Sequence, residues 1–393
     1  MLISPTLPTN IKGELTQELL ILAEEVCIKS AALLSGYNPQ LKTSIQDLLR
    51  ITNSYYSNRI EAQSTHPIEI EKAMKKKFSS DSKEKSLQKL SIAHIQTQKY
   101  VESYCKRNKE VINREFIKLI HKEFYEAEGM DNFLMVEGHT MVAGEFRNMD
   151  VEDGKHIAPT YSNISGVFNY FEHEYKKVYF CSTKAKKLLA ALSSHHRLAY
   201  LHPFLDGNGR VSRLHLDAML LKMGLDGYGL WNISRGLARD VAEYQKYLGL
   251  ADMKKQGAKD GNGELSLRGL EYYLKFMLKT ALDQIEFMGK RLQITELDKR
   301  LSLFVRFSQE GLFGAEILPK HSELLFTKLL VCGELPRGEV KDVIGKATGT
   351  ASTLIKNLLA MEYLESDTPR GAVRLKLNTF FASKLIPDLI PEN

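Results

Sequence analysis

The sequence predicts a mainly α-helical fold with one short β-hairpin and a smaller C-terminal domain of three helices and two strands. Apolar residues recur at helical spacing through most of the 393 residues. Asp153-Gly154 is a hairpin turn signal between residues 142–147 and residues 156–159. After residue 320 the helical stretches are followed by two segments in which apolar and polar residues alternate, as they do in paired strands.

Helices are expected on both sides of the hairpin. Apolar spacing predicts them over residues 11–34, 44–62, 86–103, 111–124, 164–178, 183–201 and 211–223. Residues 75–82 begin with three lysines and are typical of a solvated helix end and loop. Residues 227–250 form a further helical stretch, and residues 270–301 predict long helices that close the domain.

The C-terminal part follows a linker over residues 311–319, which holds Gly311, Gly314 and Pro319. Three helices are expected beyond it, over residues 322–331, 337–344 and 348–361. Two strands are expected over residues 363–366 and 372–377. The chain length fits two or three domains. We expect an N-terminal helical region over residues 1–105, a core over residues 106–310 and a C-terminal domain over residues 320–393.

Composition excludes few classes of protein. The net charge of +6 is mild for this length and demands neither nucleic acid nor membrane as a partner. Hydrophobic residues at 43% and charged residues at 26% are ordinary for a globular protein. Four widely separated cysteines form no metal-spaced pair and indicate reduced thiols in a cytoplasmic protein. Residues 1–10 show no signal pattern, and no apolar run approaches a membrane span.

One stretch combines a proton acceptor, an anion site and a metal ligand within twelve positions. It reads His202-Pro203-Phe204-Leu205-Asp206-Gly207-Asn208-Gly209-Arg210, with Arg213 three residues later. Proline disfavours helical geometry in the residue before it, so the preceding helix should end at or near His202. Gly207 and Gly209 permit close approach of the backbone. The helix that follows presents free N–H groups and a positive dipole end to an anion.

The charged residues of this stretch suit the phosphates of a nucleotide. Arg210 and Arg213 are three positions apart, so both can project from one face of the first helical turn. Guanidinium groups are always charged and offer forked donors to phosphate oxygens. Asp206 supplies a hard oxygen ligand, and a magnesium ion could bridge it to the phosphate oxygens. An ordinary turn would need no such set of residues.

These residues at these spacings resemble the core motif of the Fic family, whose usual chemistry transfers AMP from ATP onto a protein hydroxyl. The resemblance implies an all-helical Fic catalytic core, with ATP and Mg²⁺ as substrate and cofactor. It implies that His202 deprotonates the target hydroxyl as a general base and that Asp206 holds Mg²⁺. Asn208 and the N–H groups around Gly207 and Gly209 would cradle the α-phosphate as an oxyanion hole does.

The same resemblance gives roles to the two arginines and to the predicted hairpin. Arg210 and Arg213 would bind the β- and γ-phosphates and orient pyrophosphate as the leaving group. The hairpin is similar to the Fic flap, which grips an extended segment of the target protein by strand addition. Gly144, Phe146 and Arg147 would then contact the target. The alternative is an ordinary solvent-facing hairpin.

Residues 57–62 form a third point of resemblance, near the C-terminal end of a helix expected from about Pro39 onward. They are similar to the inhibitory motif of Fic proteins that carry it N-terminal to the core, which gives Ser57 and Glu61 an inhibitory role. The glutamate would pair with Arg213 and keep the γ-phosphate from binding productively. The family pattern usually has Gly or Asn after the glutamate, whereas this chain has Ala62. The alternative is an exposed glutamate on a helix surface.

The C-terminal domain resembles a winged helix-turn-helix, which often follows a Fic core and can read DNA with its third helix. Residues 337–376 carry seven Lys or Arg and five Asp or Glu, so their net charge is only +2. Lys356 is the one charged residue of the third helix, which is little for phosphate neutralisation. We therefore favour protein interaction or a homodimer over DNA as its role.

The sequence favours a protein adenylyltransferase that modifies an unknown target protein. A DNA-binding regulator whose Fic core senses a nucleotide is the alternative from another class. A Fic site that removes AMP, or that uses another nucleotide donor, shares the same base and anion hole.

Overall fold

The computed structural model describes residues 6–9, 14–107, 109–153, 156–261, 263–314 and 317–392. The turn residue Gly154 and the first residues of the helix expected over 11–34 lie outside these ranges. The described helices are α1 (Gln17–Ala32), α2 (Pro39–Ile60), α3 (Pro67–Met74), α4 (Ser82–Lys106), α5 (Arg114–Tyr125), α6 (Ile164–Cys181), α7 (Lys184–Leu201), α8 (Asn208–Lys222), α9 (Ser234–Arg239), α10 (Val241–Asp252), α11 (Leu267–Arg291), α12 (Ile294–Gln309), α13 (Ser322–Cys332), α14 (Val340–Ile344), α15 (Thr348–Ala360) and α16 (Thr379–Leu385).

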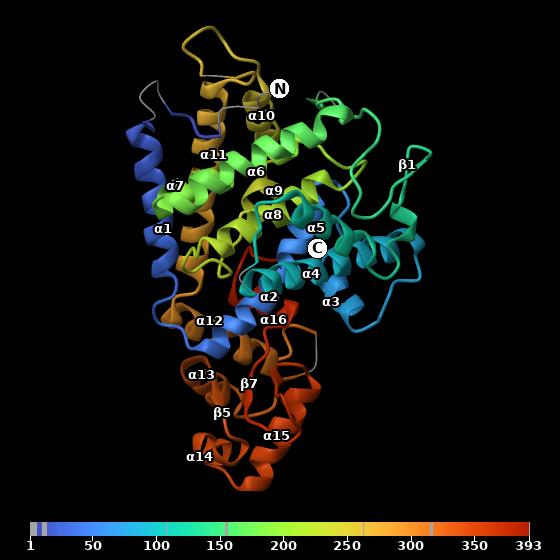
Figure 1. Ribbon diagram of the computed structural model, residues 1–393. Coiled ribbons are helices and arrows are strands. Elements are labelled where there is room, and N and C mark those ends of the chain that lie inside the picture. The colour runs from blue at the N-terminus through green and yellow to red at the C-terminus, as the bar shows by residue number, and fades with distance from the viewer. Residues whose placement is uncertain are drawn as a thin grey trace.

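Helices α7 and α8 form the centre of the larger part of the molecule (Figure 1). α1, α6 and α11 pack around α7, and α2, α4 and α5 pack around α8. The buried faces form a hydrophobic cluster that extends from Leu19 in α1 to Ile390 near the C-terminus. The chain reversal between α7 and α8 therefore lies at one end of a well-packed helical pair. None of the described helices is long and apolar enough to span a membrane.

Helix α2 begins at an N-cap residue followed by proline. The side chain of Asn38 accepts a hydrogen bond from the backbone N–H of Leu41 at 2.7 Å, and Pro39 occupies the first helical position. The helix ends at Ile60, so Glu61 lies at its C-cap. One face of α2 is buried along its length and includes polar residues, among them Asn53, Ser54 and Ser57. Buried polar groups on a helix indicate specific partners on its neighbours.

The strands among the described residues are short and form three small sheets. β1 (Met135–Val136) pairs with β2 (His139–Thr140), and β3 (Glu152–Asp153) pairs antiparallel with β4 (His156–Ile157). A hairpin thus lies at the predicted position around Asp153, but its first strand is β3 and not residues 142–147. Residues 142–147, expected as the first half, form turns and irregular structure instead.

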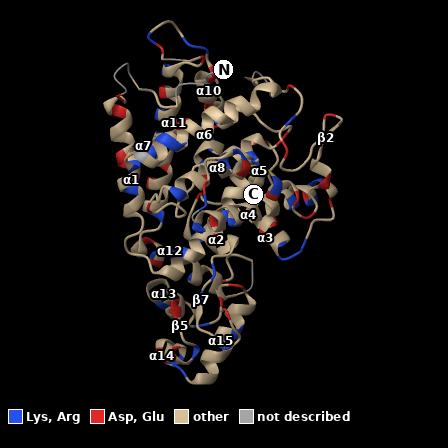
Figure 2. Ribbon diagram, viewed as in Figure 1, with Lys and Arg blue, Asp and Glu red and all other residues tan. Residues whose placement is uncertain are grey.

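The C-terminal part contains α13, α14 and α15, the three helices that the sequence predicts, with a sheet in the order β5-β7-β6. β6 (Leu364–Glu365) and β7 (Val373–Leu375) lie within the two predicted strands. β5 (Glu334–Leu335) was not predicted, because two residues carry no readable alternation. α3 and α16 were not predicted either. In Figure 2 basic and acidic residues alternate along this part without forming a basic stripe.

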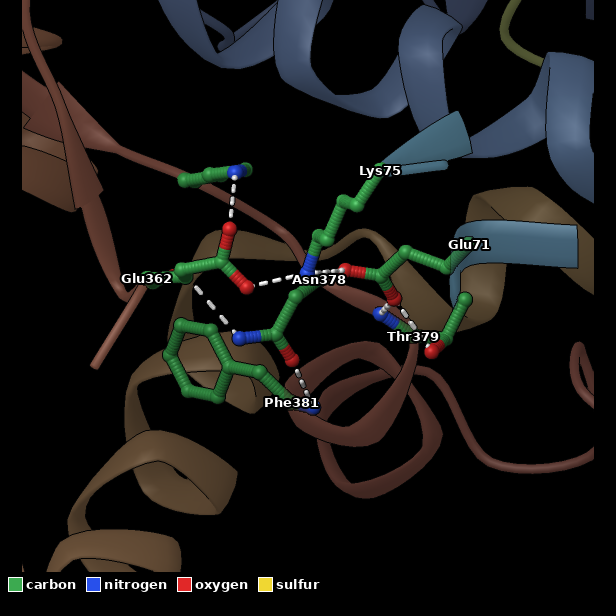
Figure 3. A network of polar contacts seen from close by, with 7 residues as sticks. Glu71, Lys75, Glu362, Asn378, Thr379 and Phe381 are labelled. Carbon is green, nitrogen blue, oxygen red and sulfur yellow. Dashed lines mark hydrogen bonds and ion pairs between the residues drawn. The ribbon is translucent and has the colours of Figure 1, made fainter. Parts of the chain in front are cut away.

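A polar network joins the C-terminal part to α3 (Figure 3). Glu71 accepts hydrogen bonds from the backbone N–H and the hydroxyl of Thr379, at 2.8 and 2.5 Å. Lys75 bridges Glu71 and Glu362, and the side chain of Asn378 donates to the backbone oxygen of Glu362. α2 is held by the same part of the chain, since Tyr56 donates its hydroxyl proton to the backbone oxygen of Leu389. The C-terminal part is therefore docked on the helices that precede the central pair.

Candidate active site

The chain reversal between α7 and α8 places His202 next to the start of a helix. α7 ends at Leu201, and His202 is its C-cap with a left-handed backbone angle φ of +49°. This confirms the prediction that the helix ends before Pro203. Asn208 closes the loop on itself, because its side chain accepts from the N–H of Phe204 and donates to the oxygen of Phe204, both at 2.9 Å. Asn208 thus shapes the loop, and its predicted contact with a phosphate stays a prediction.

Gly207 is the N-cap of α8 and adopts a φ of +79°. A Cβ atom at this position would lie 2.6 Å from the Tyr125 hydroxyl oxygen. Both the backbone angle and the space therefore require glycine here. Because Gly207 and Gly209 carry no side chains, a negatively charged group can approach the N–H groups of the first turn of α8.

We expect Gly207→Ala to destabilise the fold by more than the roughly 1–2 kcal/mol that a left-handed alanine costs, since Tyr125 must also move. Gly224→Ala is the matched control, because Gly224 has a φ of +66° and no atom within 4 Å of its added Cβ. Urea unfolding of both variants measures the difference. Equal losses in the two variants would contradict the contact with Tyr125.

Arg210 and Asp206 form a hydrogen-bonded network with the buried Tyr125. The Tyr125 hydroxyl donates to Asp206 at 2.8 Å, and Arg210 Nη2 donates to the same oxygen at 3.1 Å and to Tyr125 at 3.0 Å. Arg210 Nη1 donates to Gln63 at 2.6 Å. Burial opposes the charge of Arg210, yet the neighbouring Tyr125, Asp206 and Glu61 raise its pKa above the ordinary value. Arg210 is accordingly a fixed cation at the first turn of α8.

Arg213 is held by the C-terminal end of α2. Its Nε donates to the hydroxyl of Ser57 at 2.9 Å, and its Nη2 donates to the Ser57 backbone oxygen at 3.0 Å and to Glu61 Oε1 at 2.6 Å. The Glu61 carboxylate also lies against Gly209, where a Cβ atom would collide with it. A carboxylate therefore occupies the anion-binding end of α8. The predicted pairing of Glu61 with Arg213 is confirmed.

The short hairpin β3–β4 is fixed close to His202. Asp252, at the end of α10, lies 3.1 Å from His156 Nδ1 and 2.9 Å from His196 Nε2. Burial alone would raise the pKa of Asp252, but the hydrogen bonds from His156 and His196 hold it below its ordinary value. The ring of His156 on β4 lies 6.0 Å from that of His202, centre to centre. A strand end held by hydrogen bonds to Asp252 thus adjoins the candidate base.

The three residues that the sequence assigned to target contact are used inside the protein. Arg147 is 4% exposed and donates to the backbone oxygens of His202, Met149 and Pro159. Gly144 is buried and donates its N–H to His121. Phe146 stacks on Phe168 at 4.8 Å. These contacts hold the segment in place, and direct target contact by Gly144, Phe146 and Arg147 stays a prediction.

The comparisons with known proteins agree with this fold. Residues 111–220 match the model of the Fic/DOC family. The chain contains a Fic domain. Its fold is similar to a crystal structure of a Fic family protein from Desulfovibrio desulfuricans G20, with a TM-score of 0.53 and 14% identity over 92% of this chain and 97% of that one. It is also similar to a Fic domain containing signaling protein from Bacteroides thetaiotaomicron, with a TM-score of 0.54 and 16% identity over 68% of this chain and 96% of that one.

Sequence relatives match over shorter regions. The protein adenylyltransferase Fic of Drosophila virilis is 34% identical over 91 residues, which are 23% of this chain and 18% of the relative. The protein of the same name from Nematostella vectensis is 30% identical over 131 residues, which are 32% of this chain and 27% of the relative. The chain thus spans less than a third of the length of either relative.

Asp206 is the carboxylate of the Fic domain that would hold a magnesium ion. Mg²⁺ in phosphate-transfer sites is bound by one or two carboxylates together with substrate phosphates and water. Asp206 is 38% exposed at its side chain, and Tyr125 and Arg210 both bind its Oδ2 atom. Its second oxygen has no hydrogen bond among the described contacts. No group of three acidic, histidine or cysteine ligands occurs among the described residues. The donor set therefore fits a metal held jointly with a nucleotide.

Sequence reasoning missed Tyr125 and Gln63 at this site. Tyr125 ends α5 and is 81 positions from Asp206, so no local spacing reports their contact. Gln63 reaches Arg210 across 147 positions. Tyr125 is an aromatic residue at a helix end, a pattern that core packing also produces. These two side chains orient the groups that the motif supplies.

Proposed function

We propose that the protein is an adenylyltransferase that transfers AMP from ATP to a hydroxyl side chain of a target protein. The observation that carries this proposal is the position of His202 one loop before the first turn of α8. This turn is an anion site that already holds the carboxylate of Glu61. A base beside a phosphate-binding helix end supplies what in-line transfer of a nucleotidyl group requires. The named adenylyltransferase relatives support the same reaction class.

In this proposal His202 takes the proton from the target hydroxyl as its oxygen attacks the α-phosphorus. The bond from the α-phosphorus to the bridging oxygen of pyrophosphate breaks, and pyrophosphate leaves. N–H groups at Gly207 and Gly209 would stabilise the charge that develops on the α-phosphate. Asp206 would hold Mg²⁺, which would neutralise charge on the leaving phosphates. Arg210 and Arg213 would bind the β- and γ-phosphates.

Glu61 would act as an inhibitor of this reaction. Its carboxylate binds the guanidinium of Arg213 that the γ-phosphate needs, and it lies on the first turn of α8. An anion at a helix N-terminus is bound by the same N–H groups and dipole that bind phosphate. ATP would then bind with its γ-phosphate displaced from the orientation that in-line attack requires.

The target would bind as an extended segment along the hairpin β3–β4. Ile157 on β4 is 73% exposed and lies one residue from His156, whose ring adjoins that of His202. A strand added at this edge would gain backbone hydrogen bonds and bring a hydroxyl side chain to the base.

The domain division proposed from the sequence places the Fic core in residues 106–310 and a winged helix-turn-helix in residues 320–393. Three helices with a sheet in the order β5-β7-β6 support the latter. The exposed positions of α15, among them Ser352, Thr353 and Lys356, carry one charge. This favours contact with a protein, including a second copy of the chain, over DNA.

The test incubates the purified protein with Mg²⁺ and either α-labelled or γ-labelled ATP, in the presence of a cell lysate. Protein label from the α-position alone supports transfer of AMP. Label from the γ-position indicates phosphate transfer, and label from another α-labelled nucleotide triphosphate indicates a different donor. ATP binding without any label, in wild type and in Glu61→Gly, supports the nucleotide sensor. Loss of label from a modified target on incubation with pyrophosphate or Mg²⁺ alone supports removal of AMP.

A further inference from the structure

A cavity of about 280 Å³ lies between α2, α4 and α8, on the side of α8 away from its N-terminus. Apolar side chains form much of its wall, namely Leu49, Val101, Leu214, Leu221 and Trp231. Polar groups converge on one region of it, and they include Asn53, Gln98 and Asp217. Small-molecule sites are commonly cavities of roughly this size with apolar walls and a few convergent polar groups.

Asp217 is a carboxylate in this cavity that has no cationic partner among the described ion pairs. Its hydrogen bonds come from two neutral groups, the hydroxyl of Tyr228 and the side-chain amide of Asn53, the latter at 3.4 Å. Arg50 and Glu102 also line the cavity, but they bind each other through two contacts of 2.8 and 2.7 Å. A carboxylate removed from water without a counter-charge costs free energy that a bound cation would recover.

A second acceptor beside Asp217 is also unpaired. Asn53 is 5% exposed, and its Oδ1 has no hydrogen-bond partner among the described residues. Its orientation is fixed, because Gln98 donates from Nε2 to the backbone oxygen of Arg50 and so offers its Oε1 to the Asn53 amide at 2.9 Å. If the Asn53 amide were turned over, its Oδ1 would face the Gln98 Oε1 and Asp217 Oδ2 atoms, and three acceptor oxygens would meet. The cavity therefore holds a carboxylate without a cationic partner among the described ion pairs, next to a buried amide oxygen without a hydrogen-bond partner.

We propose that this cavity is a binding site for a small organic cation, an ammonium or amidinium group on an apolar body, which pairs with Asp217. The cationic group would donate to the Asp217 carboxylate, and the apolar body would lie against Trp231 and the aliphatic wall. The cavity is small, so the ligand is a metabolite-sized amine and not a nucleotide.

The site is connected to the inhibitory contact along one helix face. Asn53, Ser57 and Glu61 are spaced four residues apart on α2, and Asp217, Arg213 and Gly209 are spaced four apart on α8. The two rows face each other in antiparallel order, as Asn53 with Asp217, Ser57 with Arg213, and Glu61 with Arg213 and Gly209. A cation that replaces Asn53 as the hydrogen-bond donor to Asp217 removes one of the contacts between these two rows. We therefore expect it to raise AMP transfer, a consequence that rests on the proposed function.

The binding test uses the full chain and does not depend on any activity. Isothermal titration at pH 7.5 compares benzamidine and phenethylamine with benzamide, which has nearly the size of benzamidine but no charge. We expect saturable binding of both cations, at least tenfold tighter than benzamide, and loss of that preference in Asp217→Asn. Glu102→Gln is the charge-matched control and keeps the preference, because Arg50 already neutralises Glu102.

Three outcomes of the titration would overturn the site. They are equal binding of benzamidine and benzamide, a preference that survives in Asp217→Asn, and no saturable binding of either cation below about 10 mM. If the cations bind as expected and no variant transfers AMP, the site stands while the proposed function fails. If the protein transfers AMP and bound phenethylamine leaves the rate unchanged, the connection to Glu61 is wrong.

The pH dependence of binding gives an independent readout. Burial raises the pKa of Asp217 to about 7, with the neighbouring Glu102 acting in the same direction and Tyr228, Asn53 and Arg213 opposing it. A cation binds the ionised carboxylate, so its affinity rises between pH 6 and pH 8 and binding releases a proton. Arg50 and Lys106 are the cations that line the cavity. The hydrogen bond to Glu102 raises the pKa of Arg50, and burial raises the pKa of Cys105 to about 11. A flat profile in wild type, or an unchanged profile in Asp217→Asn, would exclude Asp217 as the partner.

Discussion

Replacing His202 with alanine is expected to lower AMP transfer by about 10²–10⁴-fold, the usual contribution of a general base. The imidazole is the group at the end of α7 that can take a proton at neutral pH, and it lies one loop away from the first turn of α8. The rate of label transfer from α-labelled ATP, with Glu61→Gly as the background, measures this loss. ATP affinity should stay within about threefold, because the arginines and glycines that would bind phosphate are unchanged.

Two further variants separate the loss of the base from damage to the fold. His202 has a left-handed backbone angle, which asparagine tolerates better than alanine does. His202→Asn therefore removes the base with less strain and should be as inactive as His202→Ala. His173→Ala is the matched control, since the His173 side chain on α6 is 76% exposed. Transfer by His202→Asn within a few-fold of its background would contradict the role of His202 as the base.

The chain reversal that carries this base was predictable because its determinants are local. Pro203 sets the end of α7, and the glycine positions allow the tight entry into α8. The order of glycines and arginines then fixes which groups face the anion site. The pairing of Glu61 with Arg213 spans 152 positions, and it was predicted from family resemblance, since no local spacing indicates it.

Other parts of the site could not be predicted, because contacts between residues distant in the sequence leave no local spacing pattern. Tyr125, Gln63 and the Asp252 bridge between His156 and His196 depend on the packing of helices that are distant in the sequence. The burial of the Arg147 guanidinium against three backbone oxygens was not predicted either, because the resemblance to the Fic flap gives Arg147 a target contact and indicates none of these internal ones. These bonds satisfy groups that would otherwise be unpaired.

Replacing Glu61 with glycine is expected to raise AMP transfer by about 10- to 100-fold. Hydrogen bonds to charged groups contribute roughly 1.5–3 kcal/mol, and removing the carboxylate frees Arg213 and the first turn of α8 together. Glu310→Gly is the matched control, because Glu310 is also a helix C-cap, with a φ of −81° against −90° for Glu61. It should leave the rate unchanged, and both variants should unfold at similar urea concentrations.

The departure of this chain from the family pattern bears on how tightly Glu61 is held. Ala62 has a φ of +55°, an angle that glycine adopts freely and that costs alanine about 1–2 kcal/mol. Because Ala62 directly follows Glu61, this backbone strain cancels part of the free energy that the Glu61–Arg213 contact contributes. Wild-type protein should therefore retain measurable transfer, and Ala62→Gly should lower it further. No gain in Glu61→Gly, with ATP bound and His202 intact, would show that the carboxylate does not limit the reaction.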